Sequence, residues 1–201
     1  MANENKHPSE NCTQVAKYCE GLERDAYPDP GSTLGKALTK AGLNMRSYRS
    51  YRGWEALNGT PWTIGYGHTT GVKQGDVCSE QQAYKWLQED MEKAAALVRR
   101  HVPWEMAQGQ FDALCDMAFN MGSAFMAKDA EKDDFDDVLR AQDTCEIRKR
   151  IPTFRKGGGV VLPGLVKRSA MRVALWDGYG YHDAIRMGEE TLLMWRANGS
   201  K

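Results

Sequence analysis

Helical periodicity dominates the chain after residue 78, and this pattern constrains the fold more than any other feature. Ser79 and Gln82 have the spacing of a capping box ahead of a helix of about twenty residues, and further helices are predicted over 106–121, 134–141 and 165–176. The strand pattern is confined to the first third, where residues 62–68, WTIGYGH, form a β-branched and aromatic run broken by two glycines. We therefore expect an α+β fold, with a small N-terminal lobe around a short β-hairpin and a larger helical C-terminal lobe.

The chain has 201 residues, of which 41% are hydrophobic, enough to bury one core. A single domain over 1–201 is predicted, with a small lobe at 10–78 that carries an inserted loop at 30–62, and a helical lobe at 79–201. The first helix is expected to start near Asn11, where Asn11 and Gln14 match a capping box. Gly21 is then expected to end it, leaving Glu20 in the last turn.

Composition excludes several function classes. The 27 basic side chains balance the 27 acidic ones, so net charge gives no attraction to nucleic acid. The N-terminus has no signal-peptide pattern and no long apolar run follows, so a cytoplasmic protein without membrane insertion is expected.

The five scattered cysteines lack a CxxC pair, which argues against a disulfide scaffold and a zinc site and favours mostly buried thiols. The acidic run 129–137 lacks the pattern of a calcium loop, so a helix start is predicted there and no metal.

Four carboxylates fall within residues 19–29, CEGLERDAYPD. Hydrolysis of a glycosidic bond needs one carboxylic acid that protonates the leaving oxygen and a second carboxylate that activates water or attacks the sugar. Glu20 suits the acid, because the negative end of a helix dipole disfavours its charged form. Asp29, in the turn PDPG, suits the ionised partner, although an Asx-turn residue is the alternative. Glu23 and Asp25 are interpreted as surface charges.

The surrounding residues resemble a known family. EGLERDAYPD followed by WTIGYGHTTG is similar to the catalytic signature of the bacteriophage-type lysozymes, the endolysins or muramidases of glycoside hydrolase family 24, and the similarity continues in QGQFDALCDMAFNMGSAF and PGLVKRSAMRVALW. This resemblance implies a lysozyme-like fold with a cleft between the lobes and no cofactor. It also implies cleavage, with inversion, of the β-1,4 bond between N-acetylmuramic acid and N-acetylglucosamine in bacterial peptidoglycan.

The same resemblance assigns roles to individual residues. Glu20 matches the general acid, Asp29 the carboxylate that activates water, and Thr63 the hydroxyl that holds the water. His68 matches a mainly structural histidine, and Lys167 or Arg168 a cation facing the acid, with Arg168 preferred. The residues matching the saccharide-binding positions are Thr69, Phe119 and Asn120. A monomer that accumulates in the host cytoplasm and reaches the wall through a holin-type pore, causing host cell lysis, is also implied.

The chain departs from the compact members of this family by the thirty-three residues between Asp29 and Thr63. This segment carries five cations against the single acid Glu55, interleaved with aromatic residues. One interpretation is contact with sugar rings and an anionic envelope. The other is that Trp54 and Trp62 anchor the loop while its cations are solvated.

Three other functions stay open. A lytic transglycosylase needs one carboxylic acid and leaves an anhydro-sugar. A wall-binding protein could keep the lysozyme fold without activity. A cysteine paired with His68 could act as an amidase or peptidase nucleophile, although Cys19 and Cys115 are expected on apolar helix faces.

Overall fold

The computed structural model describes residues 2–128 and 133–199. The chain divides into two compact units, a small one over Glu20–Glu89 and a helical one that joins Met1–Cys19 to Asp90–Lys201. These boundaries differ from the predicted lobes 10–78 and 79–201. The first helix groups with the helical unit because its contacts are there: the Cys12 thiol donates to the Asp112 carbonyl, and Asn11 accepts from the Tyr181 N–H.

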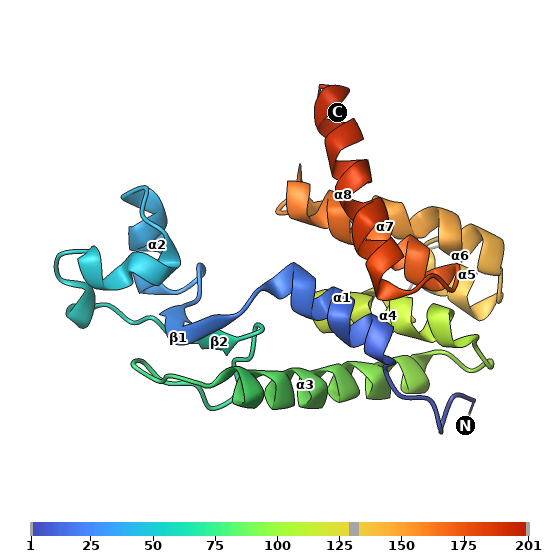
Figure 1. Ribbon diagram of the computed structural model, residues 1–201, viewed down its shortest axis with the longest axis horizontal. Helices are drawn as coiled ribbons and strands as arrows, with labels where there is room; N and C mark the ends of the chain where they lie inside the picture. Colours follow the sequence, from blue (N-terminus) through green and yellow to red (C-terminus); the bar gives the residue numbers. More distant parts are fainter. Residues whose placement is uncertain (1, 129–132, 200–201) are drawn as a thin grey trace. The chain divides into compact units, whose positions relative to one another are not determined.

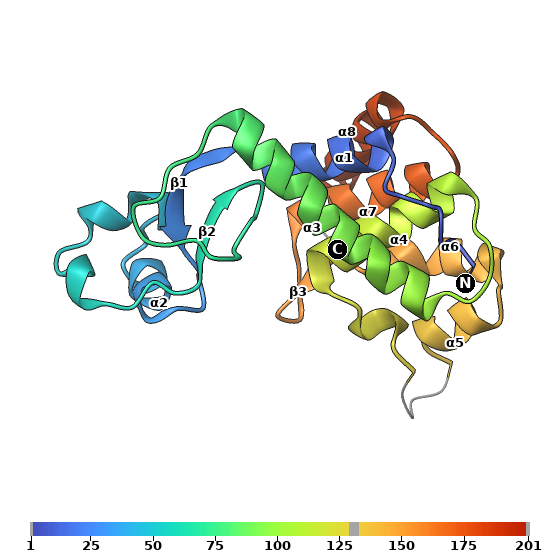
Figure 2. The same cartoon turned by 90° about the horizontal axis from the view of Figure 1, so that it is seen from below.

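The small unit is built on a two-stranded antiparallel sheet, β1 (Glu23–Pro28) and β2 (Trp62–Gly65), drawn side by side in Figures 1 and 2. Tyr27 pairs with Thr63 and Pro28 with Trp62, and the register shifts between Glu23 and Tyr27. The strand predicted within 62–68 is therefore confirmed.

The insertion between these strands is folded rather than an open loop. It contains helix α2 (Thr33–Lys40) and the 3-10 helices η1 (Met45–Ser50) and η2 (Trp54–Ala56). Leu34 and Leu38, four residues apart on α2, face the interior with Tyr48 from η1. They pack with the hairpin residues Ala26, Trp62 and Ile64. With Trp62 counted, the insertion thus supplies four of the six buried residues in this cluster.

Long helices make up the second unit, whose α7 and α8 lie against one another in Figure 1. Two helices connect the units along the chain: Glu20 is the last residue of α1, and α3 starts within the small unit. The bounds are α1 (Glu10–Glu20), α3 (Glu80–His101), α4 (Gln108–Met121), η3 (Ala124–Met126), α5 (Phe135–Arg140), α6 (Thr144–Arg150), η4 (Ile151–Thr153), β3 (Lys156–Gly157), β4 (Val160–Val161), α7 (Pro163–Trp176) and α8 (Tyr181–Ala197). None of the described helices has the length and apolar character that crossing a bilayer requires.

Helix ends follow local signals in some places and distant contacts in others. Ser79 caps α3, accepting from the Gln82 N–H at 3.1 Å, as predicted. The cap predicted at Asn11 is wrong, because α1 begins one residue earlier and Ser9 accepts from the N–H groups of Cys12 and Thr13. Asp134 caps α5, which confirms a helix start in the acidic run, although 129–132 lie outside the described residues.

Sequence patterns missed several elements. Helices α6 and α8 were not predicted, nor was the hairpin β3–β4, which closes over the glycine pair 158–159, both with φ near +60 to +80°. The expectation of mostly buried thiols is wrong for three of five cysteines. Cys12 and Cys115 are buried, whereas Cys19 and Cys78 are half-buried and Cys145 is exposed.

A buried ionic cluster ties α4 to α7. Asp116 accepts from Arg168 through both carboxylate oxygens, at 2.9 and 2.8 Å, and from Arg172 at 2.6 Å. Asp116 and Arg172 have no exposed side-chain surface. Burial alone would raise the pKa of Asp116, but the two guanidinium groups outweigh it and lower the pKa to about 2. The carboxylate is therefore ionised across the physiological range.

We predict that Asp116→Asn destabilises the protein by about 3–5 kcal/mol at pH 7, because removal of one partner leaves buried guanidinium charge uncompensated. The folded pKa lies below the unfolded value of about 3.9, so the stabilisation is complete above that value and is lost as pH falls towards 2. Urea unfolding should show the gap between wild type and variant shrinking below pH 4. A gap that stays constant down to pH 2, or an equal loss in the exposed control Asp25→Asn, would contradict this account.

Candidate active site

Glu20 lies at the junction of α1 and the small unit's hairpin. Gly21 follows with φ +70°, a left-handed conformation that ends the helix as predicted. The Glu20 carboxylate lies against the turn that follows β2: a Cβ built on Gly67, where φ is +88°, would be 3.5 Å from Glu20 Oε2. The GYGH turn therefore brings its backbone into van der Waals reach of the proposed acid.

Asp29 follows β1 directly, and its N–H, its carbonyl and its carboxylate all make hydrogen bonds. Its N–H donates to the Pro61 carbonyl at 2.9 Å, and its carbonyl accepts from the Ser32 N–H at 3.0 Å. Its carboxylate Oδ1 accepts from the Gly31 N–H at 2.7 Å, which is the Asx turn named above as the alternative to a catalytic role. A carboxylate has about four lone-pair positions, so this turn fixes the group's orientation while leaving acceptor capacity for a water molecule.

Thr63 lies in β2, opposite Tyr27 of β1, and Asp29 follows the end of β1 two residues after Tyr27. Thr63 is 9% exposed. It follows two residues after Pro61, whose carbonyl accepts from the Asp29 N–H. The thirty-three intervening residues leave and return at adjacent positions of the sheet. The structure thus brings these two predicted site residues together, with Glu20 in the same unit.

His68 is fixed by contacts on three sides. Its backbone exchanges two 2.9 Å hydrogen bonds with Ile64, its ring stacks on Trp86 at 4.8 Å between centroids, and its Nε2 lies 3.0 Å from the Thr70 carbonyl. Thr69, assigned to saccharide binding, is the exposed residue that follows it. These contacts orient the turn that faces Glu20.

Tyr27 was not assigned a role by sequence, although it stands within the quoted motif. Burial raises the pKa of its hydroxyl, Arg46 opposes the rise, and the carboxylates of Glu20, Glu23 and Asp29 reinforce it. Tyr27 therefore lies within the electrostatic field of both proposed catalytic carboxylates. Arg46, from the insertion, lies over the Tyr27 ring at 4.9 Å and is hydrogen bonded to Glu23, so Glu23 is not a simple surface charge.

The insertion packs its aromatic residues inward and exposes its cations, with the Arg49 guanidinium 4.9 Å from the centroid of the Tyr48 ring. Tyr48 and Trp62 are buried at 1% and 5% exposure, and Trp54 packs edge-on against Tyr48. This confirms the anchoring interpretation for the tryptophans, and burial leaves the rings of Tyr48 and Trp62 unavailable for stacking on sugars. The four other cations are exposed: Lys36, Lys40, Arg49 and Arg52.

The remaining predicted residues belong to the helical unit. Phe119 is half-buried with the Arg168 guanidinium 5.8 Å from its ring centroid, and exposed Asn120 accepts from Arg172 at 2.9 Å. Arg168 is the cation held by Asp116, whereas Lys167 binds Glu189 at 3.0 Å and lies over the Tyr18 ring. The two cations thus have different partners, and Asp116 is a residue that sequence reasoning missed.

Thiol chemistry and metal binding find little support. Burial raises the pKa of Cys12 and Cys115 well above the usual range and raises that of Cys78, so these thiols stay protonated. Among the described residues, one acidic group could hold a metal ion, namely Asp134, Asp136 and Asp137. Its groups have other partners, since Asp134 caps α5 and Asp136 pairs with Arg140.

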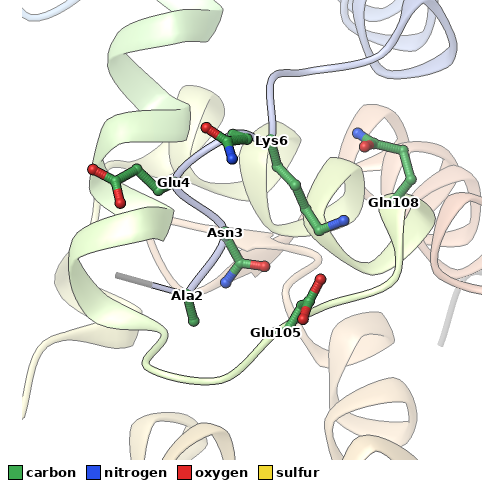
Figure 3. Close-up of a pocket in the computed structure, with 7 residues that line it drawn as sticks. Ala2, Asn3, Glu4, Lys6, Glu105 and Gln108 are labelled. Carbon is green, nitrogen blue, oxygen red and sulfur yellow. The ribbon is translucent and has the colours of Figure 1, made fainter.

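A polar pocket of about 410 Å³ lies elsewhere in the helical unit, between the N-terminal segment and the chain before α4 (Figure 3). Its lining includes Asn3, Glu4, Lys6 and Glu105, but none of the predicted site residues. The side-chain amide of Asn3 donates to the Trp104 carbonyl and accepts from the Met106 N–H. Asn3 therefore stabilises the fold at this place.

The sequence of the chain is similar to those of known proteins. The family model described as phage lysozyme matches residues 40–172, which include Thr63, His68, Phe119 and Arg168 but neither Glu20 nor Asp29. An endolysin of Acyrthosiphon pisum secondary endosymbiont phage 1 is 33% identical over 150 residues, which are 73% of this chain and 97% of the relative. An endolysin of Lactococcus phage c2 is 32% identical over 147 residues, which are 70% of this chain and 60% of the relative.

Structural similarity extends over most of the chain. The active form of the P1 phage endolysin Lyz superposes with a TM-score of 0.62 at 21% identity, covering 87% of this chain and 86% of that one. This likeness shows a lysozyme-like fold and confirms the α+β class predicted from sequence. With the family model matching more than half of its residues, the chain belongs to the phage lysozyme family.

Proposed function

We propose that this protein is an endolysin that hydrolyses the β-1,4 bond between N-acetylmuramic acid and N-acetylglucosamine in peptidoglycan. The observation that carries the proposal is that Asp29, at the end of β1, and Thr63, in the paired strand β2, lie at the same end of one hairpin, with Glu20 against the adjoining turn. Endolysin relatives that match most of this chain support it.

In the proposed reaction, Glu20 donates its proton to the glycosidic oxygen as the bond breaks. Asp29 accepts a proton from the attacking water, whose position the Thr63 hydroxyl fixes by hydrogen bonding. Water attacks the face opposite the leaving group, so the anomeric configuration inverts. Arg168, fixed by Asp116, is the proposed cation of the site, and Thr69, Phe119 and Asn120 are proposed to contact the glycan.

The cellular setting is proposed from the family resemblance. The protein would act as a monomer, accumulate in the host cytoplasm and reach the wall through a holin-type pore. No cofactor is needed, because the three proposed groups supply the acid, the base and the water-binding hydroxyl.

A lytic transglycosylase is the nearest alternative, and an inactive wall-binding protein is the other. A transglycosylase uses the sugar's own hydroxyl as nucleophile and has no need of a carboxylate for water. The rigid placement of Asp29 beside Thr63 favours hydrolysis over both alternatives.

We predict that Glu20→Gln and Asp29→Asn each lower peptidoglycan hydrolysis by about 10²–10⁴-fold, the usual contribution of a general acid or base. Release of soluble muropeptides from purified walls measures this. Asp25→Asn changes an exposed carboxylate of β1, between the two proposed catalytic residues; it is the matched control and should keep full activity. Glu20→Gln that still releases muropeptides would overturn the mechanism.

The exposed cations of α2 generate a second prediction. Lys36→Glu with Lys40→Glu should slow lysis of whole walls several-fold at low salt, because the anionic envelope no longer attracts this face. The difference should vanish at high salt. Lys73→Glu with Lys85→Glu changes the charge equally at exposed positions outside the insertion and should have less effect. Equal effects from both pairs would discard a special role for α2.

A further inference from the structure

Both ends of the insertion bind the same residue, Asp29. From its start, the Gly31 N–H donates to Asp29 Oδ1, and the Ser32 N–H and hydroxyl donate to the Asp29 carbonyl. From its end, the Pro61 carbonyl accepts from the Asp29 N–H. Every hydrogen bond described for Asp29 is therefore made with the inserted segment.

The Ser32 hydroxyl makes two hydrogen bonds, one to Asp29 and one to α2. Its Oγ donates to the Asp29 carbonyl at 2.6 Å and accepts from the Gly35 N–H at 2.9 Å, which makes it the N-cap of α2. Ser32 is 7% exposed, so water competes little for either bond. The first turn of α2 and the backbone of Asp29 are thus joined by a single buried side chain.

Gly35 shows how closely α2 approaches this turn. A Cβ built on Gly35 would lie 2.1 Å from the Asp29 carbonyl oxygen and 2.7 Å from Pro30 Cα. The requirement here is space, because a backbone atom cannot move aside as a flexible side chain could. The helix and the Asp29 turn are therefore in direct backbone contact.

Helix α2 is itself fixed to the core of the small unit. Leu34 and Leu38 are fully buried, and the Leu34 N–H donates to the Asn58 carbonyl at 2.9 Å. Because the core is closely packed, it resists displacement of the helix. A continuous path of contacts runs from the core through α2 and Ser32 to Asp29.

We propose that Ser32 is a positioning residue for Asp29, and that the insertion is the support of the catalytic base. The inference rests on the proposed function, in which Asp29 activates water. Misplacement of a reacting group by about 1 Å can cost on the order of 10²-fold in rate. Loss of the Ser32 hydroxyl should therefore lower kcat while leaving KM, because substrate does not bind to this buried group.

The test compares two caps in the same insertion. Ser32→Ala removes the cap of α2, and Asn44→Ala removes the cap of η1, where Asn44 Oδ1 accepts from the Arg46 N–H at 2.9 Å. Both variants should lose similar thermal stability. Ser32→Ala should lower kcat about tenfold or more with KM unchanged, whereas Asn44→Ala should retain kcat. Ser32→Thr, which keeps the hydroxyl, should recover most of the activity.

A double variant separates positioning from general destabilisation. If Ser32 acts through Asp29, adding Ser32→Ala to Asp29→Asn should cause no further loss of residual hydrolysis. A folded Ser32→Ala with wild-type kcat, or a full additional loss in the double variant, would overturn the positioning role. Full activity of Asp29→Asn alone would instead overturn the proposed function.

Discussion

The closure of the hairpin at Asp29 is the constraint on which the small unit depends. The Asp29 N–H binds the far end of a thirty-three-residue insertion, and its carbonyl binds the near end. Closing a longer loop costs only about 0.6 kcal/mol per doubling of its length, so length alone does not prevent Asp29 and Thr63 from meeting. The two ends of the insertion must instead meet Asp29 in a defined geometry, and the hydrogen bonds of Ser32 and Pro61 to Asp29 fix that geometry.

The helical unit has a similar feature, a single residue that is hydrogen bonded to several partners. Asp116 holds Arg168 and Arg172 of α7 from α4, with no exposed surface on its side chain. Removing one partner from such a cluster leaves a buried charge uncompensated and strongly lowers the free energy of unfolding. The intact cluster, by contrast, adds little stability relative to apolar side chains of similar volume. We infer that the cluster serves to fix the guanidinium of Arg168, the residue proposed as the cation of the site.

Sequence patterns predicted those features whose causes are local. The end of α1 at Gly21, the cap at Ser79 and the strand at 62–68 each depend on a few neighbouring residues, and each was found. The roles of Asn11 and Asp116 depend on partners that spacing does not reveal, such as the Tyr181 N–H, 170 residues from Asn11. The buried positions of Tyr48 and Trp62 were left open for a similar reason, since alternating cations and aromatics suit either a binding surface or a folded core. Resemblance, rather than periodicity, supplied the roles of Glu20, Asp29 and Thr63.

The anomeric configuration of the first product tests the proposed chemistry most directly. Proton NMR during the first turnovers on a soluble peptidoglycan fragment distinguishes the α from the β anomer before they interconvert. Attack by a water held between Asp29 and Thr63 predicts a new reducing end that appears first as the α anomer. A product that appears first as the β anomer, or an anhydro-sugar with no reducing end, would contradict the account.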